Sequence, residues 1–156
     1  MCDYSLHGIK SRLAEKGETL VVHRFFTGSK GLTSPEYLKP TQSAKGFMAI
    51  LKRMFVSGLK ECAVCIPDGA KLVLRRISPA LQQTHGLSGS EPVTFRQLSA
   101  DAAAYRDAVE FQNGVKIRLQ ELEESQEAEV LALSSEEAGA PEAVFLSAGT
   151  RLGTRV

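Results

Sequence analysis

Hydrophobic and polar side chains alternate in several short stretches of this chain, which is the pattern expected of half-buried β-strands. Residues 19–26 (TLVVHRFF) are rich in β-branched and aromatic side chains and predict a first strand. Residues 93–98 and 128–133 predict two further strands. Residues 27–44 and 78–92 are dense in Gly, Ser, Thr and Pro and predict loops. The first expectation is therefore a mainly β fold.

One segment has a different period. The apolar side chains of residues 45–58 recur at i, i+3, i+4, i+7 and i+8, which predicts a short helix that ends at Gly58. Lys45, Lys52 and Arg53 would lie on the other side of this helix and form a basic surface. We expect this surface to contact a partner.

A thirteen-residue pattern occurs twice in the chain, at an offset of 45 residues and without gaps. The two copies are CAVCIPDGAKLVL at residues 62–74 and DAVEFQNGVKIRL at residues 107–119. Each copy reads as two strands joined by a turn that contains Gly, so we expect one β-hairpin used twice. This repeat would make Cys65 and Glu110 equivalent positions.

The second copy distinguishes two possible turns. A two-residue turn would set Phe111 opposite Lys116 and would mix apolar and charged faces. A three-residue loop sets Phe111 opposite Val115, so that cross-strand partners share a face. We therefore predict a three-residue loop that ends in a left-handed Gly. The same loop in the first copy would set Val64 opposite Leu72.

These elements predict a mainly β fold, a small barrel-like sheet built from two pseudo-repeated β-hairpins, with one short helix in residues 45–58. The length of 156 residues is typical of one domain. We assign residues 1–133 to a single β-rich domain, in which residues 27–60 are an insert that carries the helix. Residues 134–156 form a C-terminal tail that either docks on a partner or is weakly ordered.

The charge of the chain is nearly balanced, with 19 Lys and Arg against 18 Asp and Glu, but it is unevenly distributed. Residues 1–78 are mainly basic and residues 79–156 are mainly acidic. Either the basic half forms a face for an acidic partner, or it pairs with the acidic half within the fold, which we favour. No basic run alternates with aromatic side chains, so we expect a protein partner or a homo-oligomer rather than nucleic acid.

No apolar run is long enough to span a bilayer, and the N-terminus lacks the apolar core of a signal peptide. We therefore expect a cytoplasmic protein without a membrane span. The three cysteines, Cys2, Cys62 and Cys65, cannot all pair with one another, and reduced thiols are the simplest interpretation.

Cys62 and Cys65 have the spacing of half a zinc site, but residues three apart in a strand face opposite sides of the sheet. Cys62 would share the core face with Val64, and Cys65 would point the other way. Two unrelated thiols are the favoured interpretation.

Cys2 is the candidate nucleophile if the protein is an enzyme. Removal of Met1 would leave Cys2 with both a thiol and an α-amine, and the amine can serve as the general base. The folds that use this chemistry are usually larger than the strand count predicts here. We therefore expect a protein without catalytic activity.

Cys2, Asp3 and His7 are close enough in sequence to share a metal ion with one or two ligands from elsewhere, such as Cys65, His23 or Glu110. This mixture of sulfur and imidazole ligands suits zinc or iron. The spacing is not specific to a metal site, so no cofactor is predicted outright.

Two polar segments offer contacts for a partner. Tyr105 and Arg106 precede the strand that begins at Asp107 and form a candidate corner for partner binding. Residues 119–130 carry five Glu side chains and form either a solvated turn or a docking surface for basic groups.

The opening Met-Cys-Asp-Tyr-Ser-Leu-His, the Asp-Ala-Val-Glu-Phe-x-x-Gly motif at Asp107 and the Glu-x-x-Gln…Val-Leu-x-Leu motif from Glu123 resemble a family of small uncharacterised bacterial proteins. The resemblance covers both ends of the domain but little of residues 27–60. It implies a bacterial, cytosolic protein and brings no specific activity. The family favours His before the Asp-Ala strand, where this chain has Tyr105 and Arg106, and this departure argues against a site built on those histidines.

The sequence therefore predicts a small soluble binding or accessory protein without enzymatic activity, acting as a subunit of a larger bacterial assembly. Its docking elements would be the basic helix, the tail and the corner at Tyr105. One alternative is a metal or thiol site with Cys2, His7 and Cys65. A less favoured alternative is a hydrolase with Cys2 at its N-terminus.

Overall fold

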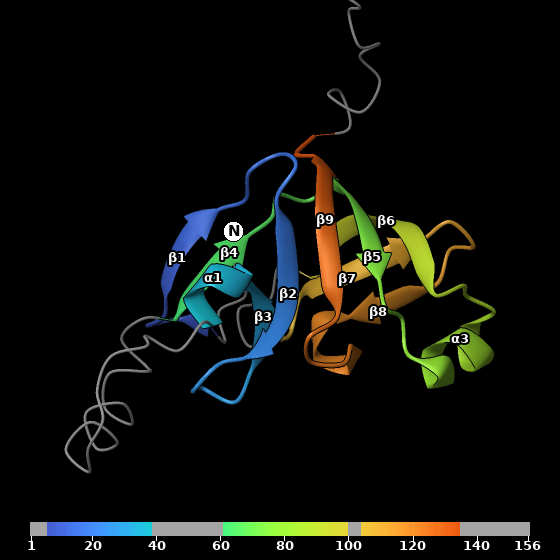
Figure 1. Cartoon of the computed structure of the whole chain (residues 1–156), viewed down its shortest axis with the longest axis horizontal. Helices are drawn as coiled ribbons and strands as arrows, with labels where there is room; N and C mark the ends of the chain where they lie inside the picture. Colours follow the sequence, from blue (N-terminus) through green and yellow to red (C-terminus); the bar gives the residue numbers. More distant parts are fainter. Residues whose placement is uncertain (1–5, 39–60, 100–103, 135–156) are drawn as a thin grey trace, which may run out of the picture.

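Nine β-strands are the main secondary structure of the computed structural model, which describes residues 6–38, 61–99 and 104–134 of the chain (Figure 1). The strands are β1 (Lys10–Leu13), β2 (Thr19–Arg24), β3 (Lys30–Thr33), β4 (Cys62–Cys65), β5 (Lys71–Arg75), β6 (Ser90–Gln97), β7 (Asp107–Phe111), β8 (Lys116–Arg118) and β9 (Glu127–Ala132). The helices are α1 (Pro35–Leu38), α3 (Pro79–His85) and the 3-10 helix η2 (Leu119–Glu121). The prediction of a mainly β fold is confirmed. The helix predicted for residues 45–58 lies outside the described residues.

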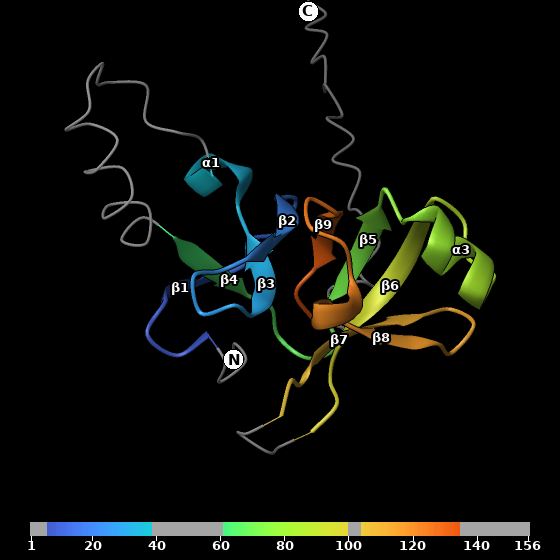
Figure 2. The same ribbon diagram turned by 90° about the horizontal axis from the view of Figure 1, so that it is seen from below.

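Seven of the strands form one open antiparallel sheet in the order β3-β2-β9-β5-β6-β7-β8. This sheet curls into a half-barrel (Figure 2), in agreement with the barrel-like shape predicted. β1 and β4 form a separate parallel pair. The buried hydroxyl of Thr33, at the end of β3, donates to the carbonyl oxygen of Cys62 (2.7 Å) and links this pair to the large sheet.

The first predicted hairpin is wrong. β4 pairs in parallel with β1, so that Cys65 lies opposite Leu13, and it does not pair with β5. β5 instead pairs with β6 on one edge and with β9 on the other. Because both edges of β5 are already paired, β4 cannot pair with β5. Gly69 has the left-handed conformation expected (φ 87°), but the chain passes here from one sheet to the other. The sequence repeat is therefore not a structural repeat, and Cys65 is not equivalent to Glu110.

The second predicted hairpin is confirmed. β7 and β8 pair with Val109 opposite Ile117. The amide of Phe111 donates to the carbonyl of Val115 (2.8 Å), and Gly114 is left-handed (φ 84°). This is the three-residue loop that the alternation of the faces requires. β2, β6 and β9 also occur where strands are predicted.

β3 and α3 lie in segments predicted as loops. β3 contains Gly31, where an added Cβ would lie 2.8 Å from Cδ1 of Leu6, so a larger residue here would displace the side chain of Leu6. α3 begins after Ser78, whose side chain accepts from the amide of Leu81, and ends at the left-handed Gly86. Among the described residues, no helix combines the length and the apolar character that crossing a membrane requires.

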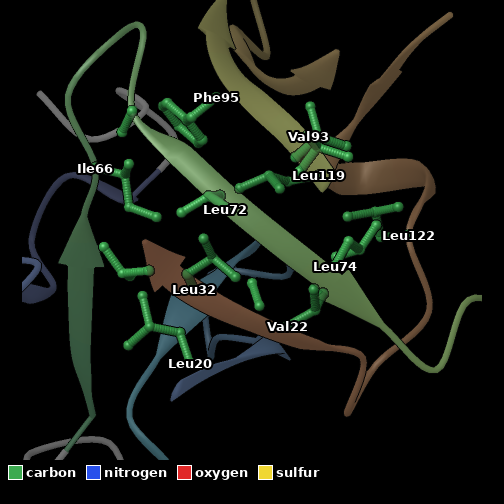
Figure 3. Close-up of a cluster of buried hydrophobic side chains, with 14 of the residues drawn as sticks. Leu20, Val22, Leu32, Ile66, Leu72, Leu74, Val93, Phe95, Leu119 and Leu122 are labelled. Carbon is green, nitrogen blue, oxygen red and sulfur yellow. The ribbon is translucent and has the colours of Figure 1, made fainter. Parts of the chain in front are cut away.

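The main core fills the inside of the curled sheet (Figure 3). Seven large side chains of this core are at most 2% exposed. They come from several strands and from the segment after η2: Leu20, Val22, Leu72, Leu74, Phe95, Leu122 and Val130. Val64 and Ile66 belong to the same core, so the two sheets share it. Ala63 faces a second small cluster with Leu6, Ile9 and Phe25. Both faces of β4 are therefore covered, and all four of its residues are buried.

A glutamine bridges the two edges of the half-barrel. The amide of Lys30, on β3, donates to Oε1 of Gln120 (2.9 Å), and Nε2 of Gln120 donates to the carbonyl of Lys30 (2.7 Å). Nζ of Lys30 donates in turn to the carbonyl of Gln120 (3.1 Å). Gln120 lies in η2, directly after β8, so its side chain takes the place of a strand partner between β3 and β8.

Ion pairs join the basic half of the chain to the acidic half, as the charge distribution predicts. Arg24 pairs with Glu124 (2.8 Å), Arg76 pairs with Glu127 (3.1 Å), and Arg75 pairs with Glu129. The acidic segment at residues 119–130 thus finds part of its basic counterpart within the fold.

Candidate functional site

An open groove with a volume of about 750 Å³ lies against the face of the sheet that points away from the core. Its polar lining comes from the loop after β1, from β5, β6 and β7, and from the turn after β7: Lys16, Lys71, Thr94, Arg96, Glu110 and Gln112. Its apolar lining includes Leu131 of β9. The groove therefore draws on four strands that are adjacent in the sheet but distant in sequence.

Strand register explains why these polar side chains meet. Lys71 on β5 lies opposite Thr94 on β6, Thr94 lies opposite Glu110 on β7, and Glu110 lies opposite Lys116 on β8. The neighbouring positions of the same strands form the inner row, in which Leu72 lies opposite Val93 and belongs to the core. Because side chains alternate between the faces of a strand, one row packs the core and the other lines the groove.

A charged cluster occupies the β6–β7 side of the groove. Nε of Arg96 donates to Oε2 of Glu110 (2.6 Å), and Nζ of Lys116 lies 3.6 Å from Oε1 of Glu110. The hydrogen bond from Arg96 is the main reason that the pKa of the Glu110 carboxyl lies below its ordinary value, and the charge of Lys116 lowers it further. The same hydrogen bond raises the pKa of Arg96. Glu110 is therefore held as a carboxylate whose charge is already compensated.

The β5–β9 side of the groove has a different electrostatic character. Nζ of Lys71 donates to the hydroxyl oxygen of Thr94 (2.8 Å), which is a neutral partner. Within the described part of the chain, no carboxylate forms an ion pair with Lys71 or with Lys16. The groove is therefore lined by three cationic side chains and by one carboxylate, which Arg96 engages. This side of the groove is suited to an anionic group.

The cysteines differ from one another. Cys62 is a free, buried thiol, whereas Cys65 is bonded in a disulfide, so the expectation of reduced thiols is wrong for Cys65. A disulfide sulfur is not the thiolate that binds zinc or iron. A metal site with Cys2, His7 and Cys65 would therefore require the reduced form of Cys65. Cys2 lies outside the described residues, and His7 is exposed.

In residues 6–38, 61–99 and 104–134, no group of three or more His, Cys, Asp or Glu side chains is arranged to hold a metal ion. The metal site and the hydrolase with Cys2 as nucleophile both depend on a residue outside these ranges and stay predictions. The structure does bring His23 close to Glu61, with Nε2 and Oε1 3.4 Å apart. The ring of His23 also packs edge-on against Phe25.

The predicted docking residues are only partly described. Tyr105 is 45% exposed, and Arg106 accepts a hydrogen bond at its carbonyl oxygen from the amide of Leu98 (2.9 Å). Leu98 is itself 41% exposed, so two exposed side chains, Leu98 and Tyr105, flank this backbone contact at the end of β6 and β7. Whether this corner binds a partner stays a prediction. Lys45, Lys52 and Arg53 lie outside the described residues.

The residues of the groove were not predicted as a site. Alternation along β7 places Glu110 on the outer face, but only the register with β6 and β8 brings Arg96 and Lys116 to it. Comparison of the chain with protein-family models, with curated proteins and with solved structures gave no match. The functional argument therefore rests on the groove itself.

Proposed function

We propose that this protein is a small non-enzymatic binding protein, an accessory subunit of a larger bacterial assembly, and that it contacts its partner through the groove. The observation that carries the proposal is the excess of cationic over anionic side chains in a concave surface of about 750 Å³. Concave surfaces with a few convergent polar groups are the usual places where proteins bind their ligands.

The state of Glu110 supports binding rather than proton transfer. A general acid or base works best when its pKa lies near the working pH, so that it can both take and release a proton. The hydrogen bond from Arg96 moves the pKa of Glu110 in the opposite direction, below its ordinary value. Glu110 therefore serves as a fixed charge that orients Arg96 and Lys116.

Site-specific photo-crosslinking in the native cells tests the proposal. A benzophenone amino acid is placed at Gln112, which is exposed and lines the groove, and in a matched control at Gln83, which is exposed on α3 outside it. We expect a discrete adduct from position 112 that is absent from position 83. The substitution Lys71→Glu should abolish this adduct, because it reverses the charge at position 71 and removes the cationic excess of the groove.

Two results would overturn the proposal. One is the same adduct from positions 112 and 83, which would indicate collisions without a binding surface. The other is an adduct from position 112 that survives Lys71→Glu in a protein that unfolds like the wild type. An adduct with a second copy of this chain would identify the partner as a homo-oligomer.

A further inference from the structure

A β-bulge in β9 places an apolar side chain at the edge of the groove. Lys71 of β5 lies opposite Ala132 and Leu72 lies opposite Val130, so Leu131 is an extra residue between two regular pairs. Bulges re-aim a side chain relative to the sheet. Leu131 is 42% exposed and lines the groove, whereas both its neighbours on β9 are buried.

Backbone hydrogen bonds bring Lys16 to the same place. The amide of Gly17 donates to the carbonyl of Val130 (2.8 Å), and the amide of Val130 donates to the carbonyl of Glu18 (2.9 Å). The loop after β1 is thus joined to β9 at the residue before the bulge. Lys16 therefore lines the groove beside Leu131.

The pair formed by Lys71 and Thr94 offers hydrogen-bond donors of two kinds. Because the hydroxyl oxygen of Thr94 accepts from Nζ of Lys71, the hydroxyl proton stays available for donation. The ammonium group of Lys71 has three protons and uses one of them in this contact. A carboxylate has two acceptor oxygens and could take one bond from each of these groups, with the charge of Lys16 nearby.

The opposite wall limits what can bind. Arg96 and Lys116 already contact the carboxylate of Glu110, so the cations left for a ligand lie on the β5–β9 side, which suits a single anionic group better than a continuous polyanion. The aromatic residue of the lining, Phe111, is only 3% exposed, so it offers no ring on which a nucleic-acid base could stack. These features favour a peptide over a nucleic acid.

We propose that the groove binds a short segment of a partner protein in which an acidic residue is next to an apolar one. The carboxylate contacts Lys71, Thr94 and Lys16, and the apolar side chain packs against Leu131. This inference rests on the proposed function and adds the chemistry of the partner.

Titration of the ¹⁵N-labelled full chain with short peptides, followed by NMR, tests the inference. The probe is acetyl-Gly-Ser-Glu-Leu-Ser-Gly-amide, and the matched probes carry Gln in place of Glu or Ser in place of Leu. We expect the Glu-Leu probe to shift the amide signals of Lys16, Lys71, Thr94 and Leu131. Loss of the charge should weaken binding about tenfold, and loss of the apolar side chain about fivefold.

Protein variants provide the second arm of this test. Lys71→Met and Thr94→Val nearly keep the size of each side chain. Lys71→Met should weaken binding of the Glu-Leu probe about tenfold, and Thr94→Val should weaken it about threefold. If one of these strand variants does not fold, Lys16→Met, in the loop after β1, takes its place in the test. Lys10→Met, at an exposed position of β1 outside the groove, is the control and should leave binding unchanged.

Equal binding of the Glu-Leu and Gln-Leu probes, or no binding of either, would overturn the inference. Displacement of the probe by inorganic phosphate at a lower concentration than by acetate would identify a phosphate site instead. The two proposals can fail separately. If Lys71→Glu abolishes the crosslink at position 112 while the Glu-Leu probe does not bind, the groove is a binding surface for a partner of other chemistry.

Discussion

Arg12 and Glu18 hold the loop that carries Lys16. The guanidinium of Arg12 makes two hydrogen bonds to the Glu18 carboxylate, of 3.1 and 2.7 Å, and the amide of Glu15 makes a third (2.6 Å). Burial raises the pKa of Glu18, but these hydrogen bonds outweigh it, so the pKa lies below the ordinary value. At the scale of single residues, protonation of this carboxylate in acid would weaken the hydrogen bonds that hold the loop.

We predict that Glu18→Gln lowers the free energy of unfolding at neutral pH by about 1–2 kcal/mol, because it removes charge-assisted hydrogen bonds that are only partly buried. A folded-state pKa below the unfolded value of about 4.5 contributes stability above that pH and loses it as the pH falls through the folded pKa. The difference between wild type and variant should therefore shrink below pH 4.5. Urea unfolding at several pH values measures this difference in the free energy of unfolding. A difference that grows in acid would contradict the prediction.

The residues of the groove show what a sequence can reveal at this scale. The outward position of Glu110 follows from alternation, because Val109 and Phe111 on either side of it are buried. Its partner Arg96 could not be assigned, because the loop between β6 and β7 leaves the register of the two strands open. The bulge at Leu131 depends on pairing with β5, for which the local sequence carries no signal.

At the scale of elements, the hairpin of β7 and β8 is specified by its own sequence. Its three-residue loop follows from the apolar alternation on both arms and from Gly114, whose φ of 84° is costly for other residues. An added Cβ at Gly114 would meet nothing within 4 Å, so the cost of a substitution is conformational and not steric.

We predict that Gly114→Ala lowers the free energy of unfolding by about 1 kcal/mol, because Ala disfavours the left-handed region. Gly114→Asn should cost less, because Asn enters this region more readily than Ala does. Thermal or urea unfolding of the three proteins should give the order Gly, Asn, Ala. An Ala variant as stable as the wild type would show that the loop does not need this conformation.

The failure of the first hairpin has a physical cause at the same scale. Residues 62–74 carry the same pattern as residues 107–119, and each copy has a left-handed Gly at the turn. The alternation of apolar and polar residues in a strand defines which face is buried, but it does not define which strand pairs with it. β5 lies between β6 and β9, and β4 instead pairs with β1, whose sequence KSRL shows no alternation at all.

At the scale of the whole molecule, the half-barrel is an open sheet whose edges are joined by side chains. β3 and β8 are the outer strands, and the contact between Lys30 and Gln120 bridges the gap between them. Exposed strand edges are sites of unwanted pairing between chains. The amide of Gln120 covers both backbone groups of Lys30 and protects this edge of β3.

We predict that Gln120→Ala lowers the free energy of unfolding by about 1–3 kcal/mol, because both hydrogen bonds to the backbone of Lys30 are lost. Gln120→Glu keeps the acceptor but sets a carboxylate oxygen against the carbonyl of Lys30, so it should also be destabilising. Gln83→Ala, at an exposed position of α3, is the control and should change stability by less than about 0.5 kcal/mol. Urea unfolding compares them, and a Gln120→Ala variant as stable as the control would refute the role of Gln120.

The position of β9 between β2 and β5 determines when the fold can be completed during synthesis. Within the described residues, β2 and its partner β3 pair with the other strands of the sheet only through β9, with Thr19 opposite Glu129. At a synthesis rate of about 5–20 residues per second, β2 leaves the ribosome about 5–20 s before β9 does. Until β9 emerges, the edge of β2 that it occupies has no partner among the described strands, and β9 then completes the sheet by insertion between two strands made earlier.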